Sequence, residues 1–327
     1  MLVVTGGAGF IGSVLAAALN DAGRDDLVIV DRLGTDEKWR NLAKRDIYEI
    51  VPIGGLMEWL ERHGAEVEAI FHLGANSSTF ATDADEIVAT NLNYSIGLWR
   101  WCMAAQKPLI YASSAATYGD GLAGFDDASD LQSLKRLRPL NLYGWSKHAF
   151  DQWAVREAAR GRAPPRWVGL KFFNVFGPNE YHKGEMQSLV AKNYRRVVAG
   201  EPIRLFKSYR PDFADGAQRR DFVYVKDCAA AMLWLWRHGI ASGIFNIGSG
   251  AARSFRDLIL ATGAACGKEP AIEYVDMPET MRPNYQYFTE APMERLRLAG
   301  YEAPFTPLEA AVSDFVTFYL AQPDPYL

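Results

Sequence analysis

The amino-acid sequence predicts an α/β fold: a doubly wound parallel sheet with helices on both faces, and a smaller, mixed α/β lobe in the C-terminal part. Strand and helix patterns alternate from the first residues onward, and a glycine-rich turn joins the first strand to the first helix. The 327 residues suffice for one large α/β unit plus a smaller lobe. With 49% apolar and 23% charged residues, the composition is that of a globular protein.

The first predicted strand and helix are joined by glycines. The apolar run 2–4 leads directly into the turn, and small residues at helical spacing follow it. Gly7 permits the tight turn, Gly9 lets the backbone approach a diphosphate, and Gly12 lets the helix pack closely on the strand. The spacing fits equally well when it is counted from Gly6. Because the free N–H groups at a helix start favour an anion, the sequence predicts a Rossmann-type dinucleotide site here.

The second predicted strand, 27–30, ends in Asp31, which lies 19 residues after Gly12. An acidic residue at that distance is able to accept a hydrogen bond from an adenosine ribose, which favours NAD. Arg32 follows directly and Lys38 lies in the same polar loop. These two cations are able to pair with the 2′-phosphate of NADP, so the residues alone leave both cofactors open.

The next elements continue the alternation. We expect a third strand at 47–51, a helix at 56–63, a fourth strand at 69–75, a long helix at 86–106 that contains Asn91, and a fifth strand at 109–112. The fourth strand runs into small residues, which would let a cofactor lie against the backbone.

Hydroxyl groups cluster where the fifth strand ends, and Ser114 is among them. Open α/β sheets bind ligands at this edge. The helix predicted up to residue 160 carries Tyr143 and Lys147, which are four residues apart and so share one face. A phenol titrates at about 10, and a nearby ammonium and an oxidised nicotinamide would both lower that value. With Ser114 bonded to the reacting oxygen, these residues predict hydride transfer at an alcohol carbon.

The second half of the chain adds the smaller lobe. We expect a sixth strand at 169–178, followed by a polar loop at 180–184, a helix at 186–198 and an irregular substrate lid at 205–215. A strand from 219 then leads into a helix at 228–238, and a further strand follows at 244–248. Three helices and a strand at 271–275 complete the chain. This order assigns 1–173 and about 219–248 to the dinucleotide-binding domain, and about 174–218 and 249–327 to a substrate-binding lobe. No flexible linker separates them, so we expect the two parts to pack closely.

Composition argues against several classes of partner. The net charge is −4 and no run of basic residues occurs, which disfavours nucleic acid and anionic membranes as partners. No run of 18 apolar residues occurs, and a strand begins at once without a signal peptide, so we expect a cytoplasmic protein. Cys102, Cys228 and Cys266 are expected to be buried free thiols. The five histidines lack metal-ligand spacing, so no metal site is predicted.

Taken together, the chain resembles the extended short-chain dehydrogenase/reductases that act on nucleotide sugars. The resemblance rests on Thr5-Gly-Gly-Ala-Gly-Phe-Ile-Gly12, Asp31, Ser114, Tyr143-x-x-x-Lys147, Asn174-Val-Phe-Gly-Pro178 and Arg220-Asp-Phe-Val-Tyr-Val225. Within that superfamily it is most similar to the ADP-glycero-manno-heptose 6-epimerases. Five stretches carry this likeness: Phe71-His-Leu-Gly-Ala75, Tyr111-Ala-Ser-Ser-Ala-Ala-Thr-Tyr118, Leu140-Asn-Leu-Tyr-Gly-Trp-Ser-Lys147, Phe172-Phe-Asn-Val-Phe-Gly-Pro-Asn-Glu-Tyr-His-Lys-Gly184 and Asn284-Tyr-Gln-Tyr-Phe-Thr289.

The resemblance implies a redox epimerisation at C6 of ADP-heptose with tightly held NADP, in the synthesis of lipopolysaccharide core precursors by a homo-oligomer. Tyr143 and Lys183 would be the two acid/base groups, assisted by Lys147 and Ser114. The implied substrate contacts are Ser114, Asn174, Glu185, which stands where some relatives have serine, Lys192, Phe206, Ser208, Arg220 and Tyr285. The implied cofactor contacts are the glycines Gly6, Gly9 and Gly12 with Phe10, Ile11, Asp31, Arg32, Lys38, Leu73, Gly74, Ala75, Asn91, Lys147 and Val175.

Three alternatives remain. A sugar-nucleotide 4,6-dehydratase would carry an acidic pair after the serine, where this chain has Ala115 and Ala116. A UDP-sugar 4-epimerase would need the tyrosine alone, and Lys183 weighs against it. A non-catalytic NADP-sensing protein is expected to have lost Tyr143 or Lys147, and both are present.

Overall fold

The computed structural model describes residues 1–239, 242–279, 281–282 and 285–327. Its largest sheet has seven strands in the order β10-β6-β5-β4-β1-β2-β3, and every neighbouring pair is parallel. The strands are β1 (Leu2–Thr5), β2 (Leu27–Val30), β3 (Glu49–Val51), β4 (Ala69–His72), β5 (Leu109–Ser114), β6 (Trp167–Phe172) and β10 (Gly243–Ile247). The strand order reverses between β1 and β4, which is where doubly wound sheets bind ligands. The predicted fold class is confirmed.

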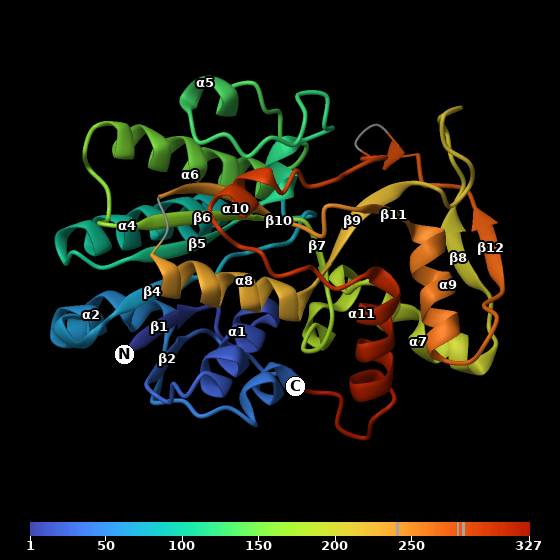
Figure 1. Ribbon diagram of the computed structural model, residues 1–327, viewed down its shortest axis with the longest axis horizontal. Helices are drawn as coiled ribbons and strands as arrows, with labels where there is room; N and C mark the ends of the chain where they lie inside the picture. Colours follow the sequence, from blue (N-terminus) through green and yellow to red (C-terminus); the bar gives the residue numbers. More distant parts are fainter. Residues whose placement is uncertain (240–241, 280, 283–284) are drawn as a thin grey trace.

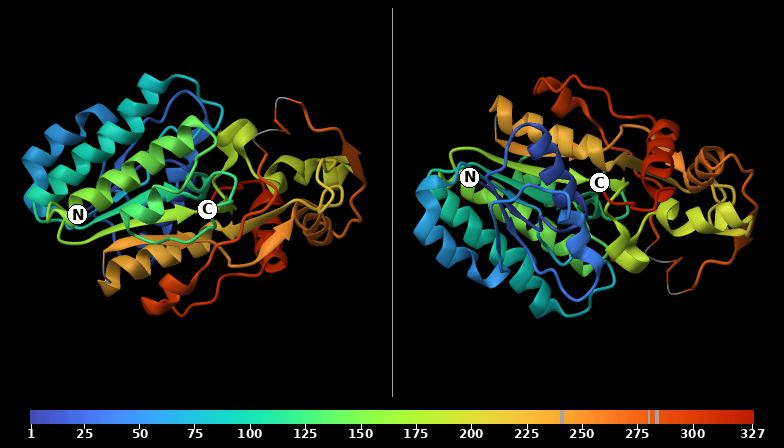
Figure 2. Two further views of the ribbon diagram at one scale, coloured as in Figure 1. Left: turned by 90° about the horizontal axis from the view of Figure 1, so that it is seen from above. Right: turned by 90° about the horizontal axis from the view of Figure 1, so that it is seen from below.

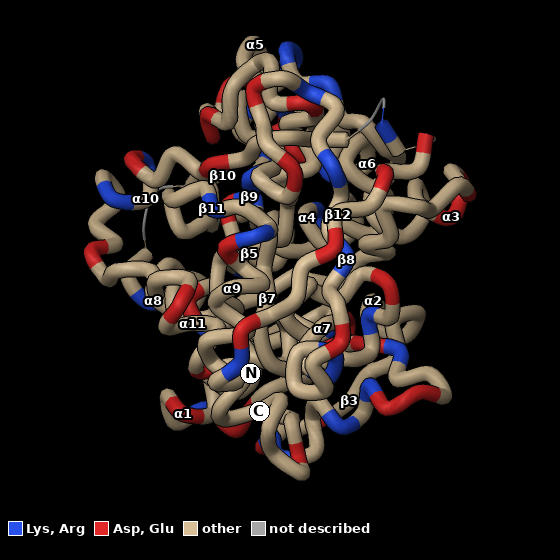
Figure 3. Tube along the Cα trace, turned by 90° about the vertical axis from the view of Figure 1, so that its right-hand side faces the viewer, with Lys and Arg blue, Asp and Glu red and all other residues tan. Residues whose placement is uncertain are grey.

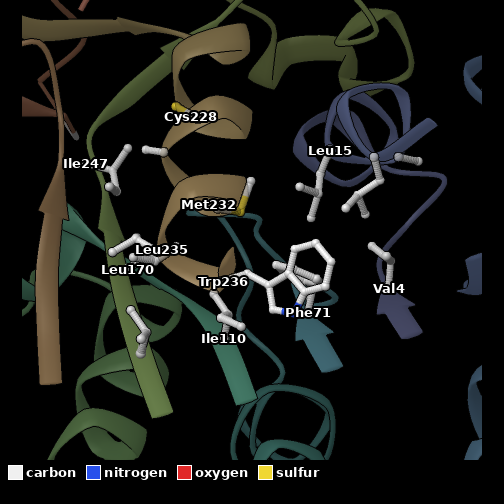
Figure 4. Packing of buried hydrophobic residues seen from close by; sticks show 14 of the residues in the cluster. Val4, Leu15, Phe71, Ile110, Leu170, Cys228, Met232, Leu235, Trp236 and Ile247 are labelled. Atoms are coloured by element: carbon white, nitrogen blue, oxygen red, sulfur yellow. The ribbon is translucent and has the colours of Figure 1, made fainter. Parts of the chain in front are cut away.

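Helices cover both faces of this sheet (Figures 1 and 2). One face carries α1 (Phe10–Asp21) and α8 (Val225–His238), and the other carries α2 (Leu56–His63), α4 (Tyr94–Ala104) and α6 (Leu142–Ala159). On the first face, side chains of α8, including Met232, Leu235 and Trp236, pack with Phe71 and other strand residues (Figure 4). These side chains are almost completely buried, so the burial of apolar area holds the two layers together.

The second lobe lies at the right of Figure 1 and contains two small sheets. One has the order β11 (Ala252–Ser254), β9 (Arg219–Tyr224), β7 (Asn174–Phe176), and the other pairs β12 (Ile272–Val275) with β8 (Ile203–Phe206). The helices α7 (Leu189–Ala199), α9 (Phe255–Ala265) and α11 (Leu308–Phe315) pack beside them. Thus β9, which the sequence assigned to the dinucleotide-binding domain, is paired within the second lobe, whereas α8 packs on α1.

The expected single strand at 169–178 is wrong, because the chain forms two strands there that belong to different sheets. β6 ends at Phe172, and the next backbone N–H, that of Phe173, still bonds to the carbonyl of Ile247 in β10. The chain then bends, and β7 pairs with β9 instead. Both halves are β-prone, so local periodicity did not locate the change of partner.

Three further predictions need correction. The region 205–215 is not wholly irregular, since its first residues belong to β8. Of the three cysteines expected to be buried, Cys102 and Cys228 are buried, whereas Cys266 is only partly buried. The long helix expected at 86–106 is continuous but changes type: α3 (Ala84–Ile87) leads into a π-helical segment, Val88–Asn93, and then into α4. The three helices expected after residue 254 correspond to α9, α10 (Glu294–Leu298) and α11, whereas β11, α5 (Leu131–Leu134), η1 (Glu37–Leu42) and η6 (Tyr181–Met186) were not separately expected.

Lys, Arg, Asp and Glu are interspersed along the trace in Figure 3, in agreement with the small net charge. Within the described ranges, none of the helices combines the length and the apolar character needed to cross a membrane. Asn284, which begins one of the stretches that carry the resemblance, lies outside the described residues.

Candidate cofactor cleft and active site

The glycine turn after β1 is tightly packed against the end of β4. Gly6 has a φ of +68°, and a Cβ on it would lie 2.6 Å from the backbone nitrogen of Gly74. A Cβ on Gly12 would lie 2.2 Å from the carbonyl oxygen of Gly6. Both distances are well below van der Waals contact, so only glycine fits at these two positions. The structure therefore brings together the turn at the start of α1 and the residues after β4.

The N-terminus of α1 has free backbone donors. Gly9 is the N-cap residue, and no side chain caps the first turn, which begins with Phe10 and Ile11. The N–H groups of a first turn have no partner within the helix, and the helix dipole favours negative charge there. This turn fits the diphosphate of a dinucleotide.

Asp31 lies at the end of β2 with almost all of its side chain buried. Its carboxylate accepts hydrogen bonds from the backbone N–H groups of Ala8 (2.9 Å) and Arg32 (2.7 Å) and forms an ion pair with Lys38 (Nζ to Oδ1, 2.6 Å). The Arg32 side chain is exposed beside this pair. The buried carboxylate is thus neutralised by a lysine from the same chain, which the sequence alone did not indicate.

The predicted cofactor contacts after β4 line the same turn. β4 ends at His72, earlier than expected, but Leu73 donates to the carbonyl of Thr5 (3.0 Å), and Gly74 donates to the Thr5 hydroxyl (3.1 Å). The small residue Ala75 is exposed beyond them.

Asn91 lies fully buried in the π-helical segment. Its amide group donates to the carbonyl of Asn76 (2.9 Å) and to the hydroxyl of Ser146 (3.0 Å), and it accepts from the N–H of Asn76 (2.8 Å). The side chain therefore fixes the loop after β4 against α6. This geometry supports the cleft through positioning rather than through a free donor.

Ser114 ends β5, and Tyr143 lies in the first turn of α6, whose N-cap is Asn141. Burial raises the pKa of Tyr143, and a hydrogen bond with Ser114 opposes that shift. Lys147, one turn further along α6, is buried, and burial lowers its pKa to about 8 while Asp151 acts in the opposite direction. The structure therefore brings the three residues together. Of the influences within the protein, burial acts most strongly on the pKa of the phenol, and the lowering expected from the sequence depends in part on an oxidised nicotinamide.

Lys183 lies in η6, on the loop after β7. Its Nζ is 5.0 Å from the ring centroid of Phe10, so it reaches the start of α1. Burial lowers the pKa of Lys183, and the buried carboxylate of Glu180 opposes that effect. A lysine with a lowered pKa close to the glycine turn has the properties of a proton-transfer group.

Three of the predicted substrate residues also meet. The guanidinium of Arg220, which is 7% exposed, lies 5.4 Å from the ring centroids of both Tyr285 and Phe255, and Phe206 packs on Tyr285 at 6.3 Å. Among the described residues, the side chain of Arg220 makes one hydrogen bond, which it donates to the carbonyl of Arg219. Desolvation lowers the pKa of Arg220, as expected for a buried cation without a carboxylate partner. Such a cation suits a phosphate-bearing ligand.

The remaining residues predicted to bind substrate or cofactor make other contacts in the structure. Lys192 pairs with the exposed Glu185 (2.9 Å), and both line a surface hollow of about 920 Å³ together with Tyr181 and Tyr326. Ser208 is bonded within its own loop to Arg210. Asn174 is exposed at the start of β7, and Val175 is partly buried between the cores of the two parts.

Sequence reasoning missed a buried polar network centred on Asp151, on the helix that carries Tyr143 and Lys147. Asp151 pairs with Lys171 (3.3 Å), and both side chains are fully buried. Asp151 also accepts from the hydroxyls of Ser113 (2.6 Å) and Tyr111 (3.1 Å). The one signal in the sequence was the spacing, because Asp151 lies one helical turn beyond Lys147 and two beyond Tyr143.

Comparisons with known proteins agree with this geometry. Residues 2–248 match the model of the NAD dependent epimerase/dehydratase family. The chain belongs to this family. The matched range includes the glycine turn, Asp31 and the Tyr143–Lys147 pair. Family membership therefore accounts for the parallel sheet together with these residues.

The chain is also similar over its full length to individual epimerases. The chain is 49% identical over 330 residues to the ADP-L-glycero-D-manno-heptose-6-epimerase of Nitratidesulfovibrio vulgaris strain DP4, and the alignment covers 100% of both chains. Among solved structures, the Helicobacter pylori ADP-L-glycero-D-manno-heptose-6-epimerase superposes with a TM-score of 0.78 at 26% identity, covering 97% of this chain and 95% of that one. The UDP-glucose 4-epimerase of Thermus thermophilus in complex with NAD gives 0.77 at 27% identity, covering 96% and 97%. Because these two TM-scores are nearly equal, fold similarity does not separate the two reactions.

Proposed function

We propose that this chain is an ADP-L-glycero-D-manno-heptose 6-epimerase, which inverts C6 of the heptose by oxidation and reduction with bound NADP. The observation that carries the proposal is Lys183, whose ammonium reaches the start of α1. It is a second titratable group beside the Tyr143–Lys147 pair of α6. The full-length similarity to heptose 6-epimerases supports the same substrate class.

Inversion of an alcohol carbon requires a proton-transfer group on each of its two sides. An alcohol carbon that is inverted presents its hydroxyl on opposite sides in the two epimers. A single fixed group is able to exchange a proton with the oxygen of only one epimer, unless the sugar turns over in the site. We assign the phenol oxygen of Tyr143 to one epimer and Nζ of Lys183 to the other. Burial favours the neutral amine of Lys183, which is the form that accepts a proton.

The residues of the cleft fit a dinucleotide. The glycines let the turn pack tightly on the residues after β4, and the uncapped start of α1 offers backbone donors. When bound, the nicotinamide supplies the hydride chemistry that side chains lack. Lys147 would hold the nicotinamide ribose and favour the ionised form of Tyr143 through its charge, and Ser114 would bond the reacting oxygen.

NADP is favoured over NAD by the Lys38–Asp31 ion pair. A free carboxylate at the end of β2 would accept from the ribose hydroxyls of NAD and repel a 2′-phosphate. In this chain, Lys38 neutralises Asp31, and the exposed Arg32 adds a second cation. Lys38 and Arg32 would therefore both face the 2′-phosphate, next to a carboxylate whose charge is already compensated.

The buried cation of Arg220, held between Tyr285 and Phe255, is proposed to bind the diphosphate of the nucleotide sugar. Asn174, at the exposed start of β7, would contact the sugar. Phe206 would support the Tyr285 ring, while Lys192, Glu185 and Ser208 would lie at the rim. The three free cysteines support a reducing compartment such as the cytoplasm.

The test is the kinetic pattern of Lys183→Met. A lysine that only binds phosphate would, once removed, raise KM, and saturating substrate would restore turnover. We expect instead that kcat falls by about 10² to 10⁴, the usual contribution of a general acid/base, with cofactor content unchanged. Tyr143→Phe removes one hydroxyl and is expected to lower kcat by a similar factor. Rescue of Lys183→Met by high ADP-heptose would show that Lys183 binds the substrate and does not transfer a proton.

A further inference from the structure

Residues 323–327 lie against the loop that carries Lys183. The hydroxyl of Tyr181 donates to the carbonyl of Pro325 (2.7 Å), and the N–H of Leu327 donates to the side-chain oxygen of Asn179 (2.9 Å). The rings of Tyr181 and Tyr326 meet edge to face, with centroids 5.1 Å apart. Tyr326 is 8% exposed, so this is a packed contact.

The same terminal residues are bound on their other side to η1 and the residues after it. Lys44 pairs with Asp324 (3.0 Å) and donates to the carbonyl of Tyr326 (2.6 Å), and the guanidinium of Arg40 lies 4.8 Å from the centroid of the Tyr326 ring. The Tyr326 ring is therefore held between η1, which carries Lys38, and η6, which carries Lys183.

The start of the Lys183 loop is fixed to the cofactor cleft. Asn179 has a positive φ of 71°, is fully buried, and donates to the hydroxyl of Ser13 in α1 (3.0 Å). Asn41 of η1 donates to the carbonyls of Ala8 (2.9 Å) and Asn179 (3.2 Å). The backbone N–H of Lys183 bonds to the carbonyl of Glu180 (3.0 Å).

Beyond Lys183 the loop is held by Lys192, which donates to the backbone carbonyl of Glu185, and by the backbone N–H of Gln187, which donates to the carbonyl of Gly184 (3.2 Å). Gly184 has a φ of +52°, a Cβ added to it would have nothing within 4 Å, and both Gly184 and Glu185 are exposed. The contacts of residues 179–181 thus fix the part of the loop that leads into Lys183.

We infer that Tyr326 is a positioning residue for Lys183, acting through its edge-to-face contact with the ring of Tyr181, whose hydroxyl bonds to the adjacent Pro325. The inference rests on the proposed function, because it presupposes that Lys183 transfers a proton. Proton transfer requires the two heavy atoms to come within hydrogen-bonding distance, so a small shift of η6 affects this step strongly. Tyr143 is carried by α6, which has its own N-cap, and is not held by Tyr326.

The test compares the two directions of oxidation in the holoenzyme. Each ADP-heptose epimer is mixed separately with enzyme loaded with NADP, and the initial reduction of the nicotinamide is followed by its fluorescence. Lys183→Met identifies the epimer whose oxidation depends on Lys183. We expect Tyr326→Ala to slow that same oxidation by about 10- to 100-fold, and the other by less than about twofold. Tyr326→Phe, which keeps the ring, serves as the matched control and is expected to behave as the wild type.

Tyr181→Phe provides a second variant if Tyr326→Ala folds poorly. It removes only the hydroxyl that bonds to Pro325, and it is expected to slow the same epimer by about three- to tenfold, the effect of a hydrogen bond worth roughly 0.5–1.5 kcal/mol. Equal slowing of both epimers, or no slowing of either, would overturn the inference while leaving the proposed function intact. If Lys183→Met itself slows neither epimer, the proposed function fails and the inference fails with it.

Discussion

The proposed preference for NADP over NAD can be tested at one ion pair. Lys38→Met removes the ammonium that lies 2.6 Å from Asp31, and only 6% of the Asp31 side chain is exposed. The change therefore acts twice: a cation that would bind the 2′-phosphate is lost, and a buried carboxylate next to that phosphate is no longer neutralised. Both effects weaken NADP binding. NAD has no 2′-phosphate, and it gains an acceptor for its ribose.

The size of the effect follows from these contacts. A hydrogen bond to a charged group contributes about 1.5–3 kcal/mol, which corresponds to roughly 10- to 150-fold in affinity. The unpaired Asp31 carboxylate adds repulsion of the same sign. Asp31 still accepts from the N–H groups of Ala8 and Arg32, so its position should survive the substitution. We expect NADP affinity to fall by about 10- to 150-fold or more, and NAD affinity to change by less than about threefold.

The assay is calorimetric titration of cofactor-free protein with each cofactor at one ionic strength. Lys38→Arg keeps the charge and is the matched control, with a small expected effect on either cofactor. Arg32→Ala should also weaken NADP far more than NAD. If Lys38→Met weakened both cofactors equally, the lysine would serve the fold of η1 rather than the phosphate, and the assignment of NADP would lose its basis.

Two other outcomes are expected. In Gly12→Ala, the added Cβ would lie 2.2 Å from the carbonyl oxygen of Gly6, so the glycine turn must shift. We expect the variant to fold but to lose its bound cofactor. Absorbance of the cofactor released on denaturation measures this, and full retention would contradict the proposed cofactor site. Turnover should fall as pH rises through about 8, because Lys147, with its pKa lowered to about 8, then loses its proton and its charge. In Lys147→Arg the side chain stays charged, so the loss of turnover should move to higher pH, although the absolute rate is lower. An unchanged pH profile would assign the loss of turnover to another group.

Features that depend on neighbouring residues could be predicted without the fold. Glycines at fixed spacing between an apolar run and a helical pattern located the turn and the start of α1. The four-residue interval placed Tyr143 and Lys147 on one face of α6, and helix α2 was predicted at its observed bounds. Local sterics, helical periodicity and turn chemistry act over a few residues, so a stretch of sequence is enough to recognise them.

Contacts between distant groups could not be predicted in this way. The chain changes sheets after Phe172 because its strand partner changes from β10 to β9, and both partners lie far along the chain. Asp151 is paired with Lys171 in the interior, and Tyr326 packs on Tyr181 from the other end of the sequence. Such contacts satisfy buried charges and fill space across large sequence separations, and no local pattern encodes them. For the same reason, the spacing of residues located Lys183 on a loop, but only the fold brought its ammonium to the start of α1.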